Sequence, residues 1–367
     1  MRLLVAMLSA GLCACGDNVT PVDASQVAPG FQPAPHTPLP QISGHSNTVL
    51  SSVRLVTITY ADDVARAQLD AFGALVVGSA WYQGVGYEYG VHAGSQVAKV
   101  HLGASPPSLT SAQAAQVVQQ VVAQQLAPAP TSRDYQLLYM LHVPAKVGHA
   151  MLGEHGFHTE IIVHQVRAAL AIVIDDAAPT VGAARMLIDA STDPYAEPDD
   201  GFYADPPAND PWSLVPGEVA DLCDAMPAVA LDDDHGELLV PRVYSNAAAL
   251  GNKASCRPAE PDEVWTDVSA DPSRIPRVVR GGQVTFHLTG WSTAQTADWA
   301  LQLEAVEGSS LSLLQLSPEL GDATINNGGR TQLILHAPIT ADLGETGAVY
   351  VRSGPSAQPW VVAIKVE

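Results

Sequence analysis

The chain has 367 residues, 47% of them hydrophobic, which is enough for two domains with cores of their own. Its 17 Lys and Arg residues stand against 38 Asp and Glu residues, so the formal net charge is −21. Because binding to phosphate groups needs clustered basic side chains, this charge argues against nucleic acid and anionic headgroups as partners. Cationic ligands and divalent metals remain open.

The first residues have the pattern of an export signal. Arg2 precedes an apolar run over residues 3–12, which is too short to span a bilayer. Residues 12–15 read Leu-Cys-Ala-Cys and resemble a bacterial lipobox. The resemblance implies removal of residues 1–14 and acylation of Cys15, and hence a protein exported to the cell envelope and anchored in a lipid bilayer, at the outer membrane or cell surface. An ordinary signal cleaved elsewhere is the alternative.

Two cysteines remain once residues 1–14 are removed and Cys15 is acylated. These are Cys223 and Cys256, and in an oxidising exported compartment we expect them to form a disulfide. A two-cysteine metal site is the alternative, although no Cys-x-x-Cys spacing supports it.

Residues 15–44 are expected to form a proline-rich tether. They contain Pro21, Pro29, Pro33, Pro35, Pro38 and Pro40 and show no apolar periodicity. Proline favours extended polyproline geometry, with a rise of about 3.1 Å per residue, so such a segment can hold the body of the protein several nanometres from a membrane.

The body, residues 45–258, alternates predicted strands with predicted helices. Residues 51–60, 135–143 and 168–174 are β-branched or apolar runs of strand length. One amphipathic helix is predicted over residues 62–81 and another over residues 108–126. The first helix has an apolar face of Val64, Leu69, Phe72 and Val76. The second helix is capped near Thr110 or Ser111. Its apolar face consists of Val117, Val118, Val121, Val122 and Leu126. This alternation predicts an α/β layer structure.

The pattern of predicted elements changes after Cys256, from alternating strands and helices to short strands alone. Residues 259–275 are proline-containing and are predicted to be a linker, and residues 276–367 are predicted to be an all-β immunoglobulin-like sandwich without helices. Its strands are expected at residues 283–288, 299–305, 311–316, 331–336, 348–352 and 360–366. No chemical motif marks this module, so we expect a spacer or an adhesion module.

Two turns are predicted near the end of the body. Residues 231–237 are rich in Asp and contain Gly236, which is typical of a hairpin turn; a calcium loop is the alternative, but the alternating acidic spacing of an EF-hand is missing. Residues 245–250 follow a short predicted strand and are expected to form a second turn.

Several segments of the body together resemble a family of secreted or lipid-anchored bacterial proteins. They are residues 87–91 (YEYGV), 156–160 (GFHTE), 191–195 (STDPY), 212–223 (WSLVPGEVADLC), 244–248 (YSNAA) and Cys256. In typical members the helix before Thr-Asp-Pro reads Ser-His-Glu-x-x-Glu-Ala. The resemblance implies a zincin-like metallohydrolase ancestry for the α/β domain, with a mixed sheet and helices.

The catalytic positions of that helix are degenerate in this chain. His at the first position and Glu four residues later share one helix face and can bind a divalent ion, and the Glu next to the His can take a proton from bound water. The same register in this chain gives Arg185, Met186 and Asp189. Arginine has no lone pair for a metal and methionine cannot act as a base, so we expect zinc hydrolysis to be lost.

The remaining carboxylates suggest an ion network. If Asp189, Asp193, Glu218 and Asp221 converge, Arg185 can supply the missing positive charge through bidentate pairing. The alternative is an exposed Arg185 with a weak pair to Asp189. Stoichiometric zinc in the purified protein would contradict both.

A compensating metal site is also conceivable in residues 155–164. This stretch offers His155, His158, Glu160 and His164 as ligands, with His158 as the position that matches the family's His. Exposed or hydrogen-bonded histidines are the alternative.

The sequence thus predicts a membrane-anchored lipoprotein with a catalytically inactive metallohydrolase-like domain, which serves binding, adhesion or envelope architecture through an unidentified protein or glycan ligand and without a cofactor. The alternative is an active, peptidase-like metal-dependent hydrolase with a rearranged zinc site of His158, Asp189, Glu218 and Asp221. A receptor for carbohydrates or cations is a third hypothesis that the sequence does not separate from the first.

Overall fold

The computed structural model describes residues 40–46, 48–131, 135–148, 156–175, 177–195, 201–215, 217–224, 226–251, 253–259, 264–268, 274–306, 308–354 and 359–367. The signal expected at residues 1–14, Cys15 and the tether up to residue 39 lie outside the described residues.

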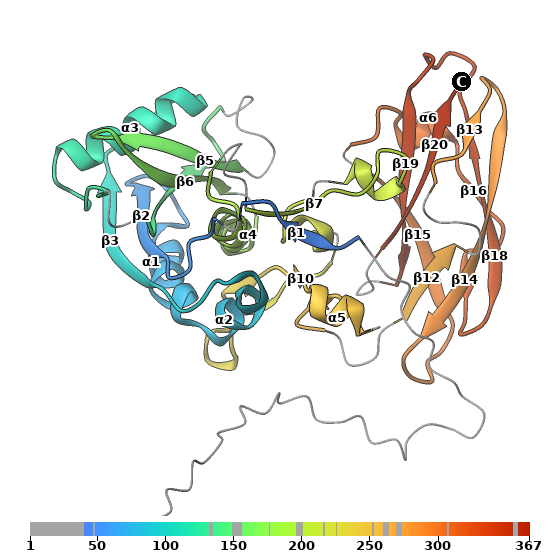
Figure 1. Ribbon diagram of the computed structural model, residues 1–367, viewed down its shortest axis with the longest axis horizontal. Helices are drawn as coiled ribbons and strands as arrows, with labels where there is room; N and C mark the ends of the chain where they lie inside the picture. Colours follow the sequence, from blue (N-terminus) through green and yellow to red (C-terminus); the bar gives the residue numbers. More distant parts are fainter. Residues whose placement is uncertain are drawn as a thin grey trace, which may run out of the picture. The chain divides into compact units, whose positions relative to one another are not determined.

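A five-stranded sheet forms the centre of the N-terminal part (Figure 1). Its strand order is β3 (Ser95–Leu102), β2 (Arg54–Tyr60), β4 (Leu137–Pro144), β6 (Val166–Asp175) and β5 (Gly156–Val163). The first four strands are parallel, whereas β5 pairs antiparallel with β6 at one edge. Every residue of β4 is buried, as expected for a central strand covered on both faces. The expected mixture of helices with a mixed sheet is therefore confirmed.

Helices cover both faces of this sheet. On one face α3 (Ser111–Ala123) shares a core with alternate residues of β2, β4 and β6. On the other face α1 (Arg66–Leu75) and α4 (Pro179–Thr192) pack against the sheet, and the short η2 (Val76–Gly78), α2 (Ala80–Gly86) and η3 (Tyr87–Tyr89) follow α1. α2 is joined to α4 by a hydrogen bond of 2.7 Å between Tyr82 Oη and Ser191 Oγ.

Local capping explains where the predicted helices begin and end. Thr110 and Gln113 form a reciprocal capping box that starts α3. Because α3 ends at Ala123, Leu126 falls outside the apolar face predicted for it and is half exposed. Val64 is likewise fully exposed, because α1 begins only at Arg66.

Short elements and one disulfide organise residues 201–259. β1 (Ile42–Gly44) pairs with β7 (Phe202–Ala204), so the end of the expected tether belongs to the fold. The other elements are η4 (Pro211–Leu214), η5 (Asp221–Cys223), β8 (Val229–Ala230), η6 (Asp233–His235), β9 (Leu239–Val240), β10 (Val243–Tyr244), α5 (Asn246–Leu250) and β11 (Cys256–Arg257). η6 lies in the turn of the β8–β9 hairpin, as expected, whereas α5 is a helix where a turn was predicted.

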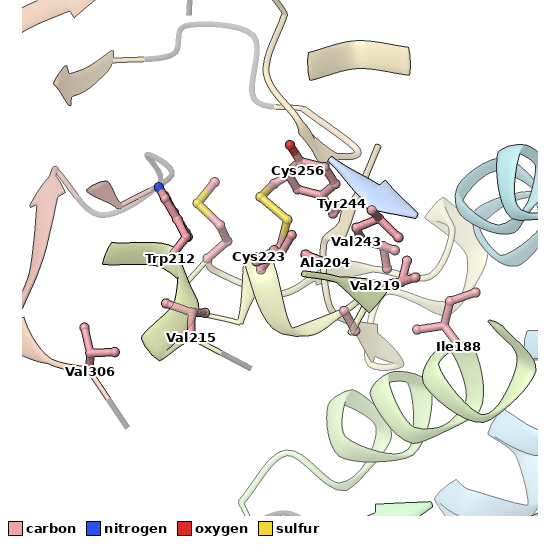
Figure 2. Close-up of a cluster of buried hydrophobic side chains, with 14 of the residues drawn as sticks. Ile188, Ala204, Trp212, Val215, Val219, Cys223, Val243, Tyr244, Cys256 and Val306 are labelled. Carbon is pink, nitrogen blue, oxygen red and sulfur yellow. A yellow bond between two sulfur atoms is a disulfide. The ribbon is translucent and has the colours of Figure 1, made fainter. Parts of the chain in front are cut away.

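The expected disulfide joins Cys223 and Cys256. Figure 2 shows it beside Tyr244, with Val219 and Val243 between it and Ile188 of α4. All four of these neighbouring side chains are fully buried. The loop that follows η4 is therefore fixed to α4 by apolar packing and to β11 by a covalent bond.

The C-terminal part consists of two sheets that share an apolar core. One has the order β12 (Val264–Val268), β14 (Gln283–Ser292), β18 (Arg330–His336) and β16 (Glu319–Leu320); the other has the order β13 (Arg277–Val278), β20 (Trp360–Val366), β19 (Thr346–Ser353), β15 (Trp299–Ala305) and β17 (Thr324–Ile325). Leu288 and Leu333 of the first sheet belong to the same core as Val349 and Val361 of the second. β12 lies within the stretch expected to be a linker. Residues 313–316 form α6 (Leu313–Leu316) instead of the predicted strand.

Among the residues that the structure describes, no helix combines the length and apolarity that crossing a membrane requires.

Candidate functional site

α4 carries the two candidate residues Arg185 and Asp189 on one side, since residues four apart lie one turn apart on the same face. Pro179 occupies the first turn of the helix, and Pro194, just beyond its last residue, cannot continue it. α4 packs against β5 and β6 on the sheet face to which His158 belongs. The helix and the edge strand therefore face each other across the site.

Asp189 is the most deeply buried carboxylate of the site. Its side chain has no solvent exposure, and its Oδ1 accepts a hydrogen bond of 2.9 Å from the backbone N–H of Ala220. Its Oδ2 has no hydrogen-bond partner in the part of the chain that the structure describes. Asp189 thus links α4 to the loop before η5 through one oxygen and leaves the other unpaired.

Glu218 enters the site from that loop because the backbone approaches β7 closely. Gly217 lies next to Ala204, where an added Cβ would come within 2.5 Å of the Ala204 carbonyl oxygen. The Gly217 carbonyl accepts a hydrogen bond of 2.7 Å from the Ala204 N–H, and Glu218 forms a β-bridge with Tyr203. Glycine is needed at this contact.

Three of the four expected carboxylates converge. Asp189, Glu218 and Asp221 each offer one oxygen, and these three oxygens all lie within 4.8 Å of one another. Asp193 is outside this group: its Oδ1 accepts a hydrogen bond of 2.7 Å from the Gly201 N–H, so it supports the chain after the helix.

Arg185 is paired rather than exposed. Its side chain is 12% exposed, its Nη2 lies 2.5 Å from Asp221 Oδ1, and its Nη1 lies 2.6 Å from Asp224 Oδ1. Of the two arrangements considered from the sequence, the structure therefore has the ion network. Met186, which the family resemblance aligns with a general base, is buried in the apolar core.

Asp224 is a member of the network that the sequence analysis did not identify. A signal was present in its spacing from Asp221, since residues three apart eclipse each other in a 3₁₀ turn such as η5. Both carboxylates therefore face the guanidinium from one turn of chain.

His158 pairs with Glu218 across the site. Its Nε2 lies 3.0 Å from Glu218 Oε1, and its side chain is 10% exposed. Burial opposes protonation of the imidazole, but the negative charge of Glu218, with smaller contributions from Asp189 and Asp193, raises the pKa of His158 to about 9. For Glu218 itself burial acts to raise the pKa, yet His158 and Arg185 lower it overall.

The carboxyl groups next to Arg185 are perturbed in the opposite direction. Burial raises the pKa of Asp189 well above its ordinary value, and the neighbouring charges of Glu218 and Asp221 add to this shift. Burial also raises the pKa of Asp221, because the nearby Arg185 offsets the loss of solvent only in part. Burial and mutual repulsion thus favour protonation of these two carboxyl groups.

Among the described residues, the other candidate metal ligands of residues 155–164 do not reach the carboxylates of this site. His155 lies outside the described residues. Glu160 pairs with Arg167 at 2.5 Å, and Arg167 lies over the ring of Tyr195 at 4.4 Å. His164 is exposed in the two-residue turn between β5 and β6. Only His158 of the predicted cluster therefore reaches the carboxylates within the described chain.

A second buried polar group lies at the carboxyl ends of the parallel strands and was not anticipated. His142 Nδ1 at the end of β4 is 3.2 Å from Asp175 Oδ1 at the end of β6, and Asp63, just beyond β2, is also buried. Burial raises the pKa of Asp175 to about 6; His142 opposes this shift, and Asp63 adds to it. Because these residues are far apart in the sequence, only the strand order brings them together.

The residues at the site do not fit the zinc centre that the family resemblance implies. Zinc prefers imidazole and thiolate ligands, but the helix supplies a guanidinium that has no lone pair to donate. The converging oxygens of Asp189, Glu218 and Asp221 suit harder cations.

Comparisons with known proteins add little to this geometry. No protein-family model matches the sequence, and no curated protein sequence matches it. Among the solved structures that match is "S-layer protein SbsC domains 4 and 5", at 12% identity and a TM-score of 0.20 over 28% of this chain and 44% of that chain. The alignment spans less than half the length of that solved chain.

Proposed function

We propose that this chain is an exported, lipid-anchored bacterial protein whose zincin-like domain no longer catalyses hydrolysis. It serves binding, adhesion or envelope architecture, with a C-terminal immunoglobulin-like module as spacer or adhesive unit. The proposal rests on the Leu-Cys-Ala-Cys pattern at residues 12–15 and on the substituted helix of the candidate site.

The single observation that carries the loss of catalysis is the pairing of Arg185. Its guanidinium stands where the resembling family has a metal-binding His, and it is held by Asp221 at 2.5 Å and Asp224 at 2.6 Å. Removing one partner of a buried ion pair costs roughly 3–5 kcal/mol. A metal ion that displaced the arginine would have to compensate for a loss of this size. Met186 provides no base that could activate water.

The fold supports the zincin-like and immunoglobulin-like parts of the proposal. The mixed sheet with its antiparallel edge strand β5, and α4 packed against it, are compatible with the ancestry implied by the helix motif. The two antiparallel-rich sheets of the C-terminal part, with alternating buried residues in β18, are compatible with a sandwich.

Restoring the missing ligands tests the proposal. We expect elemental analysis of the wild-type protein, purified in detergent, to find no stoichiometric zinc. The double variant Arg185→His with Met186→Glu should bind zinc, because the imidazole at position 185 then shares the helix face with the carboxylate of Asp189, while Glu at position 186 restores the base. Its matched control is Arg185→Asn with Met186→Gln, which removes the ion pair but supplies neither group.

Two results would contradict the proposal at different points. Stoichiometric zinc in the wild-type protein would overturn the loss of the metal centre. Failure of the restored variant to bind more zinc than its control would argue against a zincin-like ancestry of the helix.

One observation favours a second function, a metal-dependent hydrolase with a rearranged site. His158, Asp189, Glu218 and Asp221, the residues considered for it, do come together, with His158 3.0 Å from Glu218. In such an enzyme Glu218 would be the general base. Zinc-dependent hydrolysis of peptide substrates by the wild-type protein, abolished in Glu218→Gln, would establish it.

A further inference from the structure

The converging carboxylates are not neutralised by the cations around them. When Asp189, Glu218, Asp221 and Asp224 are all ionised they carry four negative charges, and Arg185 and His158 offset at most two. Arg185 divides its guanidinium between Asp221 and Asp224, and His158 faces Glu218. Asp189 has no ion-pair partner among the described residues. The deficit of two charges is thus centred on the most buried carboxylate.

Two buried side chains of the site have polar atoms without a hydrogen-bond partner among the described residues. Asp189 is completely buried and its Oδ2 has no hydrogen-bond partner within the described chain. His158 is nine-tenths buried, points its Nε2 at Glu218, and has no described hydrogen-bond partner for its Nδ1. An unpaired buried polar atom is costly, so groups of this kind mark a bound ion, a bound water or a proton.

We infer that Asp189, Glu218 and Asp221 bind a calcium ion. Calcium takes only oxygen ligands at 2.3–2.6 Å, so two of its ligand oxygens can be up to about 5 Å apart. The three oxygens lie within 4.8 Å of one another, a spacing that the longer and more flexible ligand distances of calcium can span. Magnesium, with ligands at about 2.0–2.1 Å, holds its octahedron more rigidly and usually keeps several waters.

The ligands are held in place before the ion binds. Asp189 is fixed by the Ala220 N–H, and Asp221 Oδ2 accepts a hydrogen bond of 3.3 Å from the Glu218 N–H. Cys223, two residues after Asp221, is tied to Cys256 by the disulfide. Calcium would therefore clamp α4 to the loop of residues 218–224. This binding requires neither a general base nor an imidazole at position 185, so it goes beyond the proposed function.

Calcium-dependent stability tests the inference. The full-length protein, stripped with a chelator, is unfolded by heat in increasing CaCl₂ up to about 10 mM, since extracellular calcium modules bind at roughly 0.1–1 mM. Because a ligand stabilises only the state it binds, we expect a saturable rise of the unfolding midpoint of about 5 °C, beyond that in NaCl of equal ionic strength. Calorimetric titration with CaCl₂ should give one site.

Two variants locate the ion. Asp189→Asn keeps an oxygen for the Ala220 N–H but removes the unpaired charge, so it should lose the calcium-dependent shift. Asp224→Asn is the matched control, because Asp224 pairs with the same arginine but lies outside the converging group, and it should keep the shift.

Two outcomes would overturn the inference. They are a wild-type midpoint that follows ionic strength alone, and a calcium-dependent shift in Asp189→Asn equal to that of the wild type. The first result would mean that a proton on Asp189, rather than a calcium ion, neutralises the buried carboxylate. If Asp189→Asn does not fold, Asp221→Asn in the calorimetric titration replaces it. Zinc analysis is unaffected by any of these results, so the proposed loss of catalysis stands or falls separately.

Discussion

Arg185 reaches two carboxylates at once because its guanidinium is a planar fork with donors on both terminal nitrogens. Asp221 and Asp224 approach these nitrogens separately, at 2.5 Å and 2.6 Å. A lysine ammonium is a point charge on a flexible stem and could not hold both in fixed positions. Arg185 thus fixes two positions of the chain that follows Glu218 relative to α4.

Asp175 allows a pH-dependent prediction at the scale of one residue. Burial, supported by Asp63, raises its pKa from 3.8 to about 6 in the folded protein despite the nearby His142. Between these two values the folded state keeps a proton that the unfolded state has released, so this group makes the protein less stable as pH rises from about 4 to about 6. The Asp175 contribution is then constant at higher pH.

Replacing Asp175 by Asn should remove that pH dependence. An amide oxygen can still accept a hydrogen bond from His142, but no charge is buried. We expect the free energy of unfolding of Asp175→Asn to match that of the wild type near pH 4 and to exceed it by about 1–3 kcal/mol at pH 7. Urea unfolding of both proteins at a series of pH values measures the difference. A difference that does not change with pH would contradict the prediction.

The residues of the site differ in how far the sequence could predict them. The Thr-Asp-Pro end of α4 set the register, so Arg185 and Asp189 were identified together with their chemistry. Asp224 was missed because its role depends on where a loop approaches the helix. Asp175 was missed because it and its two neighbours belong to or follow three different strands, and their adjacency follows from the strand order alone.

At the scale of elements, errors arose where apolar runs were short. Residues 311–316 were predicted to be a strand, but Ser312 and Gln315 form a reciprocal capping box that starts α6. Such a run is ambiguous from periodicity, and the capping residues decide it. Ser245 caps α5 with its side chain, which accepts a hydrogen bond from the Ala248 N–H, and alanines favour the helix.

The turn between β5 and β6 predicts a stabilising substitution. His164 and Gln165 have φ values of 49° and 65°, and the strands are paired up to Val163 and Val166. Positive φ at both central residues of a two-residue hairpin loop is what a type I′ turn needs, and Asn-Gly is the preferred sequence there. Residues with larger side chains are disfavoured in this left-handed region.

Replacing both residues, His164→Asn with Gln165→Gly, should therefore raise the free energy of unfolding by about 1 kcal/mol. The control is His164→Ala with Gln165→Ala, which removes the side-chain contacts but keeps a Cβ at both positions and should give no gain. Guanidinium unfolding midpoints compare the two variants with the wild type. Equal midpoints for both double variants would show that backbone strain in this turn is not significant.

At the scale of the whole molecule, proline content located the connecting segments but not their ends. Ile42 of the expected tether pairs with Ala204, and Val264 of the expected linker pairs with Ser292. Extended backbone can either remain single or add to a sheet, and the choice depends on a partner strand elsewhere in the chain. Local composition contains no information about that partner.

The net charge of −21 bears on the proposed membrane attachment. An acidic protein is repelled by anionic headgroups, so its net charge does not favour electrostatic binding to a membrane surface. The proposed attachment therefore relies on acylation of Cys15, the residue that the lipobox resemblance identifies. We therefore expect Cys15→Ser, expressed in a bacterial host, to lose incorporation of labelled palmitate and to move from the membrane fraction to the soluble fraction.

The response to salt separates this mechanism from surface binding. The wild-type protein should stay in the membrane fraction after a wash at about 1 M NaCl, where the Debye length falls to about 3 Å, because an acyl chain is held by apolar burial rather than by charge. Cys13→Ser is the matched control and should keep both the label and the membrane location, since Cys13 is expected to leave with residues 1–14. Membrane retention of unlabelled Cys15→Ser would contradict anchoring through this residue and would require another attachment within the exported chain.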